Sequence, residues 1–254
     1  DRSVNGNGLQ VFGTVTKTPV ATGADLVAYS GFSSSNYLQQ PYDSGLDFGT
    51  GDFSVMGWFK TSSFSAAFLF DKQDGSWGDR FSAELINGGV RCRAGGANFD
   101  VTGASEGAWE HLVILRRSGI LYGYLNGTFK ASIAGSAVTD GPYPLNFGKS
   151  NGLVDYPLTN GSLALWRVSA TAPTAAQIKK IYEDEKPLFQ ENAQATLYGT
   201  SNAVTALAYD DDTELLHAGT SSGRSVFQGL RRVSNTTDAV TTSISASNSI
   251  IVEE

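Results

Sequence analysis

Short apolar runs with alternating polar positions recur along the chain and predict β-strands. Residues 109–116 and 120–125 are two such runs, separated by a short polar break. The second run stops at Asn126-Gly127, a pair that tolerates the positive φ angles of a type I′ hairpin turn. Residues 128–133 then return as a third strand, so the segment predicts an antiparallel meander.

The first strand of this meander places Trp109, His111 and Val113 on one face, because side chains alternate along a strand. We expect this face to point inward, so that His111 is a buried core histidine rather than a base or a ligand. Cys92 is the single cysteine and lies in another alternating run. It is also expected to face the core, as an unreactive thiol.

Further runs of the same kind predict more strands in the first 170 residues. They lie at residues 53–60, 67–70, 80–86, 89–93, 142–148 and 161–168. Asn87-Gly88 predicts a second hairpin turn. Pro142 and Pro144 make their segment edge-like, because proline cannot donate to a central ladder. Short strands at this spacing favour a two-sheet β-sandwich.

One amphipathic helix is predicted after this set of strands. Thr174 and Gln177 fit a capping box, in which Thr174 is the N-cap and Gln177 reaches back to it. Ile178 and Tyr182 lie on the apolar stripe of the helix. We therefore expect a sandwich domain at residues 1–186 that ends in a short helix.

Residues 187–254 differ from the preceding residues in their sequence pattern and are predicted to form a separate β segment. Strands at 203–209, 215–220 and 224–230, joined by tight turns, follow the order of one propeller blade. One blade cannot close a ring, so we expect further blades or neighbouring chains to supply its partners. The Ser/Thr-rich tail at residues 235–251 is expected to be an extended arm that orders only against another chain.

Composition narrows the classes of partner. Only 17% of the 254 residues are charged, and the net charge is −7 with no basic cluster. This charge pattern argues against nucleic acid and against anionic membrane surfaces. No apolar run approaches the roughly 18 residues that span a bilayer, so we expect no membrane insertion. The chain begins at Asp1 without a signal-peptide pattern, and we take it as a fragment or a processed product.

Five segments carry motifs in a characteristic order. They are Asp-Arg-Ser-Val-Asn from residue 1, Phe-Ser-Val-Met-Gly-Trp at 53–58, Trp-Glu-His at 109–111, Tyr-Leu-Asn-Gly at 124–127, and a closing strand at 161–168 before a short helix. These motifs resemble the laminin-G-like branch of the concanavalin-A-like lectin/glucanase superfamily. The resemblance implies an all-β, concanavalin-A-like jelly-roll sandwich with one short C-terminal helix, to which the propeller-blade-like β segment is an extension.

The fold that the resemblance implies occurs in lectins, in hydrolases and in plain adhesion modules. Hydrolases of this kind have a Glu-x-Asp-x-x-Glu strand that supplies two carboxylates, and no such spacing occurs in this chain. We therefore expect no catalysis, and a glycoside hydrolase is the weakest alternative. Members with a structural cation often have acidic groups in the closing strand, where this chain has Ala164-Leu165. We thus expect no cofactor, with structural calcium left open.

One loop concentrates the candidate binding chemistry. Trp77 would stack on the apolar face of a sugar ring. Asp74, Asp79 and Arg80 would accept from the sugar hydroxyls and donate to them. Asp71, Asp74 and Asp79 are an alternative oxygen set for calcium. The remaining interpretation is a solvated hairpin loop in which Trp77 folds back over the sandwich edge.

We predict a non-catalytic adhesion module that binds a glycan or a cell-surface receptor. The Thr/Ser/Asn-rich texture and the blade-like segment resemble structural proteins of tailed bacteriophages, which implies a tail fibre or a virion surface, or another extracellular location. Residues 187–254 would then contact other copies of the chain or neighbouring virion proteins. The alternative is a structural or assembly protein without glycan binding.

Overall fold

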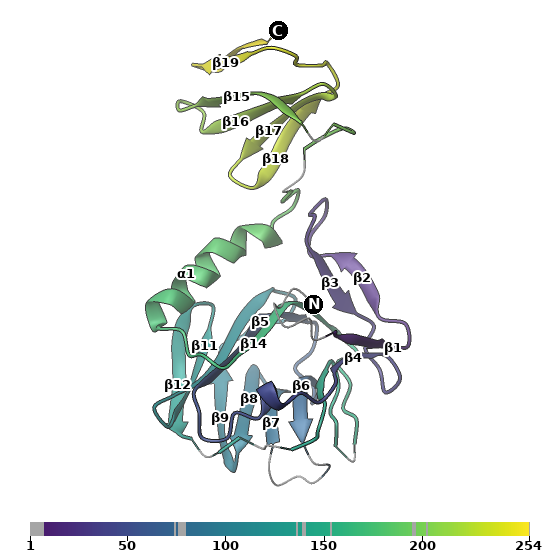
Figure 1. The fold of residues 1–254 in the computed structure, drawn as a ribbon, viewed down its shortest axis with the longest axis vertical. Coiled ribbons are helices and arrows are strands. Elements are labelled where there is room, and N and C mark those ends of the chain that lie inside the picture. The colour runs from purple at the N-terminus through teal and green to yellow at the C-terminus, as the bar shows by residue number, and fades with distance from the viewer. Residues whose placement is uncertain are drawn as a thin grey trace. The chain divides into compact units, whose positions relative to one another are not determined.

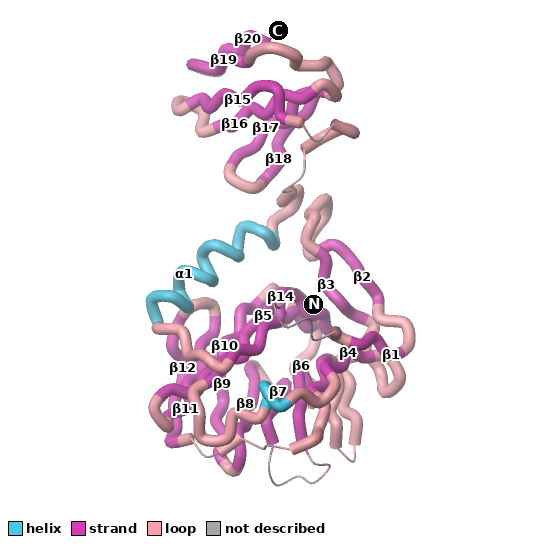
Figure 2. The backbone as a smooth tube through the Cα atoms, viewed as in Figure 1, coloured by secondary structure: helices cyan, strands magenta, loops and turns pink. Residues whose placement is uncertain are grey.

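The computed structural model describes residues 8–73, 75, 80–135, 137–138, 141–152, 154–194, 197–201 and 203–253. These ranges are almost entirely strand and loop (Figure 2). The helices are α1 (Ala175–Glu185) and two short 3₁₀ turns, η1 (Ser44–Leu46) and η2 (Lys186–Phe189). None of the helices in the described ranges is long and apolar enough to cross a membrane.

The chain divides into two compact units. One comprises Asp1–Thr18 and Ala28–Glu183, and the other comprises Pro19–Val27 and Asp184–Glu254. The assignment of residues 1–186 and 187–254 as separate domains stays a prediction.

Two seven-stranded sheets pack face to face as a sandwich (Figure 1). Sheet A has the order β1 (Gln10–Phe12), β4 (Tyr37–Gln40), β13 (Leu145–Phe147), β6 (Phe68–Gln73), β7 (Arg80–Ile86), β8 (Gly89–Gly95) and β9 (Ala97–Thr102). Sheet B has the order β12 (Thr128–Ala134), β11 (Ile120–Leu125), β10 (Glu110–Arg117), β5 (Phe53–Thr61), β14 (Gly161–Ser169), β3 (Val27–Ser30) and β2 (Thr16–Pro19). This architecture confirms the expected all-β sandwich.

Alternate side chains of both sheets meet in one apolar core. β5 contributes Phe53, Val55 and Phe59, and Phe70 and Phe81 face them from sheet A. The rings of Phe53 and Phe81 meet edge to face, with centroids 5.0 Å apart. Burying one large apolar side chain contributes about 1.5–3 kcal/mol, so these contacts hold the two sheets together.

The predicted meander is confirmed as β10, β11 and β12. At the turn between β11 and β12, Asn126 and Gly127 have φ angles of 51° and 72°, as a type I′ turn requires. Oδ1 of Asn126 also accepts a hydrogen bond of 2.9 Å from the backbone N–H of His111. The turn is therefore tied to the strand that begins the meander.

Sheet A departs from the sequence-based expectation in three of its strands. β13 lies between β4 and β6 rather than at an edge. Pro142 and Pro144 precede this strand, so the strand keeps its own N–H donors. β6 also continues past residue 70 to Gln73, and β9 is an additional strand beside β8.

Helix α1 runs across the outer face of sheet B (Figure 1). Its N-terminus has the predicted capping box, in which Gln177 N donates to Thr174 Oγ1 at 3.2 Å and Thr174 N donates to Gln177 Oε1 at 2.8 Å. Ile178 is fully buried and packs with Val113 and Tyr124 of sheet B. A second, smaller apolar core therefore lies between α1 and the outer face of sheet B.

His111 is buried as expected, but it faces α1 rather than the space between the sheets. Its ring centroid lies 5.1 Å from that of Trp58 and 6.2 Å from that of Tyr182 on α1. Leu112 takes the face between the sheets, so its neighbour must point outward. Burial, and to a lesser extent Arg167, lowers the pKa of His111 to about 4.

The second unit contains a four-stranded sheet in chain order. Its strands are β15 (Val204–Asp210), β16 (Leu215–Thr220), β17 (Gly223–Gln228) and β18 (Arg231–Thr236). Successive strands are antiparallel. This sheet is the expected blade-like extension, with β18 as a further strand beyond the three in the sequence pattern.

The expectation of an extended C-terminal arm is wrong. β19 (Ile244–Ser247) and β20 (Ile250–Glu253) form an antiparallel hairpin, and β19 lies against β15. Val240 and Ile244 are buried. Gly219 of β16 makes room for them, because a Cβ atom on it would lie 2.7 Å from Cβ of Val240. The tail therefore orders against its own chain.

We expect Gly57→Ala to lower the free energy of unfolding by about 1–3 kcal/mol, because it overpacks the core. A Cβ atom on Gly57 would overlap the indole ring of Trp166. Gly96→Ala is the matched control, since a Cβ atom there meets nothing within 4 Å. Urea denaturation of both variants measures the difference, and equal losses would contradict this account of Gly57.

We expect the free energy of unfolding to fall as the pH drops from about 6.5 to 4. Over this range the unfolded chain protonates His111, while the folded chain, with a His111 pKa of about 4, does not. At 1.36 kcal/mol per pKa unit the loss approaches about 3 kcal/mol. Urea denaturation at several pH values, compared with His111→Phe, isolates the effect from that of the carboxylates. Identical pH profiles for the two proteins would rule it out.

Candidate functional site

The two sheets have different outer faces. That of sheet B is apolar and covered by α1. On the outer face of sheet A, polar side chains alternate with the core residues of the same strands. We call this surface the polar face. It comprises Gln39, Asp71, Gln73, Arg80, Ser82, Glu84, Arg91, Arg93, Asn98, Asp100 and Asn146.

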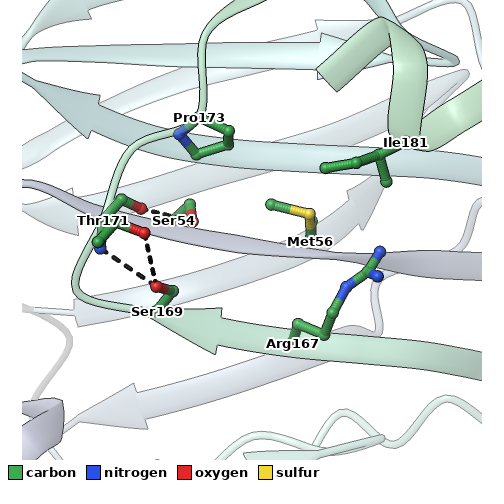
Figure 3. Close-up of a pocket in the computed structure, with 7 residues that line it drawn as sticks. All are labelled: Ser54, Met56, Arg167, Ser169, Thr171, Pro173 and Ile181. Carbon is green, nitrogen blue, oxygen red and sulfur yellow. Dashed lines mark hydrogen bonds between the residues drawn. The ribbon is translucent and has the colours of Figure 1, made fainter. Parts of the chain in front are cut away.

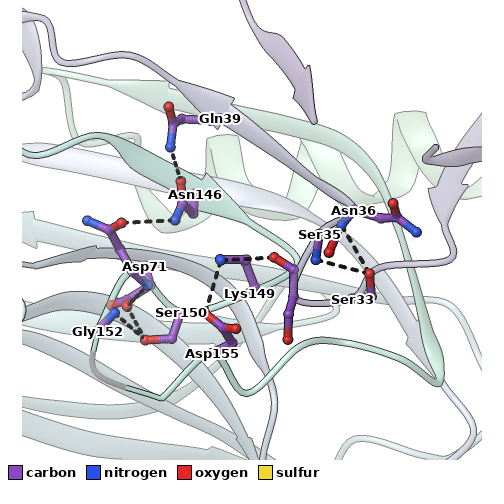
Figure 4. Close-up of polar contacts among 12 residues, drawn as sticks. Ser33, Ser35, Asn36, Gln39, Asp71, Asn146, Lys149, Ser150, Gly152 and Asp155 are labelled. Carbon is purple, nitrogen blue, oxygen red and sulfur yellow. Dashed lines mark hydrogen bonds and ion pairs between the residues drawn. The ribbon is translucent and has the colours of Figure 1, made fainter. Parts of the chain in front are cut away.

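The connection from β13 to β14 covers one end of the polar face, which we call the closed end (Figure 4). Ser150 Oγ and the backbone N of Asn151 both donate to Oδ2 of Asp71, at 2.7 and 2.8 Å. Gln73 Nε2 donates to Ser150 Oγ at 3.0 Å and also to Asp71. Asn146 donates to Oδ1 of Asn151 at 3.2 Å. This network fixes the connection on the sheet.

Several buried polar atoms at the closed end have no hydrogen-bond partner among the described residues. Burial raises the pKa of Asp71, although its hydrogen bonds, that from Gln73 first, and the nearby Arg80 oppose the rise. Asp71 Oδ1, Gln73 Oε1 and Ser82 Oγ are buried and have no hydrogen-bond partner among the described residues. Each buried unsatisfied group costs about 1–3 kcal/mol, so water or ligand hydroxyls are expected to satisfy them.

The opposite end of the polar face, the open end, has two ion pairs that solvent reaches. Arg93 Nη2 lies 3.0 Å from Glu84 Oε2, and these side chains are 23% and 16% exposed. Arg91 donates twice to Asp100, from Nε at 2.9 Å and from Nη2 at 3.1 Å. Those two side chains are 36% and 38% exposed. The open end therefore offers both donors and acceptors to a ligand.

The structure describes two of the predicted site residues. Asp71 and Arg80 are buried on the neighbouring strands β6 and β7, at the closed end. Asp74, Trp77 and Asp79 lie outside the described residues, so the sugar-binding and calcium-binding sets stay predictions. Within the described ranges, no group of three or more acidic, histidine or cysteine side chains is placed to hold a metal ion.

The predicted site omits the four residues of the open end. They are Glu84, Arg91, Arg93 and Asp100. Their signal is present in the sequence, because polar or charged residues occupy alternate positions on three successive strands, between apolar residues that form the core. Such a pattern indicates a sheet face that no apolar layer covers.

A concavity of about 250 Å³ lies on the outer face of sheet B, beside α1 (Figure 3). It is lined by Ser54, Met56, Arg167, Ser169, Thr171, Pro173 and Ile181. Its hydroxyls already serve the structure: Ser54 Oγ donates to the Thr171 carbonyl at 2.7 Å, and the hydroxyls of Ser169 and Thr171 share a bond of 2.8 Å. It is also below the roughly 300–1,000 Å³ of ordinary ligand pockets, so the polar face is the better candidate.

The fold and the sequence together identify the class of protein. Residues 32–179 match a family model, Laminin_G_3, which is described as the Concanavalin A-like lectin/glucanases superfamily. The match spans more than half of the chain and confirms the family resemblance seen in the motifs. The chain belongs to this superfamily. No curated protein sequence matches it.

Solved structures of three other proteins are similar to this chain. The binding domain of Paraclostridial Mosquitocidal Protein 1 is 14% identical, with a TM-score of 0.60 over 91% of this chain and 64% of that chain. The binding domain of Botulinum neurotoxin DC, solved with rat synaptotagmin II, is 12% identical, with a TM-score of 0.54 over 87% of this chain and 57% of that chain.

The third is domain 4 of AbnA, a GH43 extracellular arabinanase from Geobacillus stearothermophilus, solved with arabinotriose. It is 17% identical, with a TM-score of 0.52 over 68% of this chain and 87% of that chain. The chain thus spans about three fifths of the two toxin binding domains and most of the arabinanase domain. At these identities the likeness shows the fold alone.

We expect Ser150→Ala to lower the free energy of unfolding by about 1–3 kcal/mol, because it removes one buried hydrogen-bond partner each from Asp71 and Gln73. Ser65→Ala, at an exposed serine, is the control and should change stability by less than about 0.5 kcal/mol. Thermal and urea unfolding of both variants provide the measurement. A neutral Ser150→Ala would show that the closed end does not depend on this network.

Proposed function

We propose that this chain is a non-catalytic carbohydrate-binding module whose ligand lies on the open end of the polar face. The observation that carries the proposal is the polar face itself, a sheet surface of hydrogen-bonding side chains that α1 leaves uncovered. A sugar hydroxyl both donates and accepts. It therefore suits neighbouring carboxylates and guanidinium groups such as Glu84 and Arg93, whose ion pair stays partly exposed.

The predicted binding loop connects two strands of the polar face. The loop that contains Asp74, Trp77 and Asp79 joins β6 to β7, and both strands contribute side chains to the polar face. An aromatic side chain from this loop would add the stacking contact that sugar rings favour.

The similar structures add support of a weaker kind. Domain 4 of AbnA was solved with arabinotriose, and a binding domain of Botulinum neurotoxin DC was solved with SialylT. Another structure of that toxin domain holds a protein receptor, rat synaptotagmin II. These ligands belong to the other proteins, and they favour a glycan first and a protein receptor second for this chain.

The arrangement of the carboxylates supports binding without catalysis. A glycosidase needs one carboxyl group that is protonated and one that is ionised, both able to reach the glycosidic bond. Glu84 and Asp100 are each joined to an arginine in an ion pair. Asp71 is fully buried beneath Ser150 and Asn151. These carboxylates position hydroxyl groups rather than transfer protons.

For the biological setting of the module, we keep the one that the resemblance to structural proteins of tailed bacteriophages implies. We propose an extracellular or virion-surface appendage, in which residues 187–254 contact other copies of the chain or neighbouring proteins. Sedimentation velocity of the full chain at several concentrations tests the self-association. A monomer throughout the concentration range would remove it, without affecting the glycan proposal.

We expect the full chain to retain glycans on an array, and to retain them equally with and without a chelator. The described residues of the polar face bind through hydrogen bonds and need no metal ion. Binding that a chelator abolishes would instead favour calcium at Asp71, Asp74 and Asp79. An array without any retained glycan would contradict the proposed function.

We expect Glu84→Gln to weaken binding of a retained glycan by about tenfold or more, since a hydrogen bond to a charged group contributes about 1.5–3 kcal/mol. Glu183→Gln makes the same change at an exposed position on α1 and should leave affinity unchanged. Isothermal titration calorimetry measures both, and circular dichroism verifies the fold. Equal affinities for the two variants would place the ligand elsewhere.

A further inference from the structure

We propose that the polar face selects uncharged oligosaccharides over acidic ones. This inference rests on the proposed function and names the class of glycan that the site takes. It follows from how the charges of the polar face are arranged: each cationic group lies beside a carboxylate of the same face.

The two arginines of the open end already have carboxylate partners. Arg91 is joined to Asp100 by two hydrogen bonds, of 2.9 and 3.1 Å, which is the fork-to-fork geometry in which guanidinium binds a carboxylate most strongly. Arg93 is joined to Glu84 at 3.0 Å. An acidic sugar would need the same guanidinium edges, so it would have to displace a carboxylate that is tethered beside it.

The third arginine of the polar face also lies near carboxylates. Arg80 is buried, and burial and then the nearby Arg93 lower its pKa, while the charges of Asp71 and Glu84 oppose that fall. Three arginines and three carboxylates therefore share the surface, and their formal charges cancel. The whole chain has a net charge of −7, so the long-range field also disfavours an anionic ligand.

An uncharged hydroxyl meets none of these obstacles. A guanidinium group has five N–H donors, and Arg93 is joined to Glu84 through one nitrogen, Nη2. A carboxylate has more acceptor sites than one arginine fills. A sugar hydroxyl can therefore accept from Arg93 and donate to Glu84 while their ion pair stays intact. The ion pair is then the recognition element, and its charges strengthen both new bonds.

The first test uses pairs of probes that differ in charge. Trigalacturonic acid is compared with its methyl ester, lactose with 3′-sialyllactose, and the glycans retained on the array are sorted into neutral and acidic. We expect the neutral partner to bind at least tenfold more tightly. Its affinity should change less than threefold between 50 and 500 mM NaCl, because no ligand charge is screened.

The outcomes separate the inference from the function that it deepens. Tighter binding of the acidic partners, with a steep loss in salt, would overturn the inference and leave a carbohydrate-binding module. Equal binding of both partners would overturn it as well. An array and a probe set without any binding would overturn the proposed function itself.

The second test releases one arginine from its partner. Asp100→Asn removes a half-exposed carboxylate and leaves the Arg91 guanidinium without its two-bond ion-pair partner. We expect the ratio of acidic to neutral binding to rise by about fivefold or more, since an unshielded charge pair gains at least that much near a surface. Glu183→Gln changes the net charge by the same amount away from the face and should leave the ratio unchanged. An unchanged ratio in Asp100→Asn would contradict the inference.

Discussion

Each sheet of the sandwich can bury only one face against the other sheet, and this constraint determines what the remaining faces become. Sheet B meets it with apolar side chains such as Val113 and Tyr124, which require the cover that α1 supplies. Sheet A meets it with hydrogen-bonding side chains, which require partners instead of cover. The same constraint therefore produces a packed helix on the outer face of sheet B and a polar, hydrogen-bonding surface on the outer face of sheet A.

Local patterns make much of the fold predictable from the sequence. Period-two alternation predicts the strands and buries Cys92 in the core, the Asn-Gly pair marks the turn of the meander, and the capping box marks the start of the helix. Alternation does not say which of two buried faces lies between the sheets. His111 shows this limit, because a residue under α1 and a residue in the main core have the same apolar neighbours along the strand.

The candidate site was less predictable than the fold, for a related reason. A loop rich in Asp and Trp is conspicuous along the chain, whereas the polar face is spread over separate strands. Glu84 stands alone in its strand, and only the pairing of β7 with β8 and β9 places it near Arg93 and Asp100 near Arg91. The C-terminal tail shows the same difficulty, since its partner is Gly219, a residue that the tail's own composition cannot reveal.

A site built on strands differs in mechanics from one built on a rim loop. Ladder hydrogen bonds hold the strands of the polar face, and contacts with one another hold its side chains. Little of the protein would therefore become ordered when the proposed ligand binds, so the entropic cost would be small. The closed end extends this rigidity, because Ser150 and Asn151 fix the covering connection to Asp71. Recognition by such a surface depends on the match between fixed donors and acceptors and the spacing of hydroxyls. An ordered array of ion pairs suits that task, since it keeps its geometry whether or not a ligand is bound.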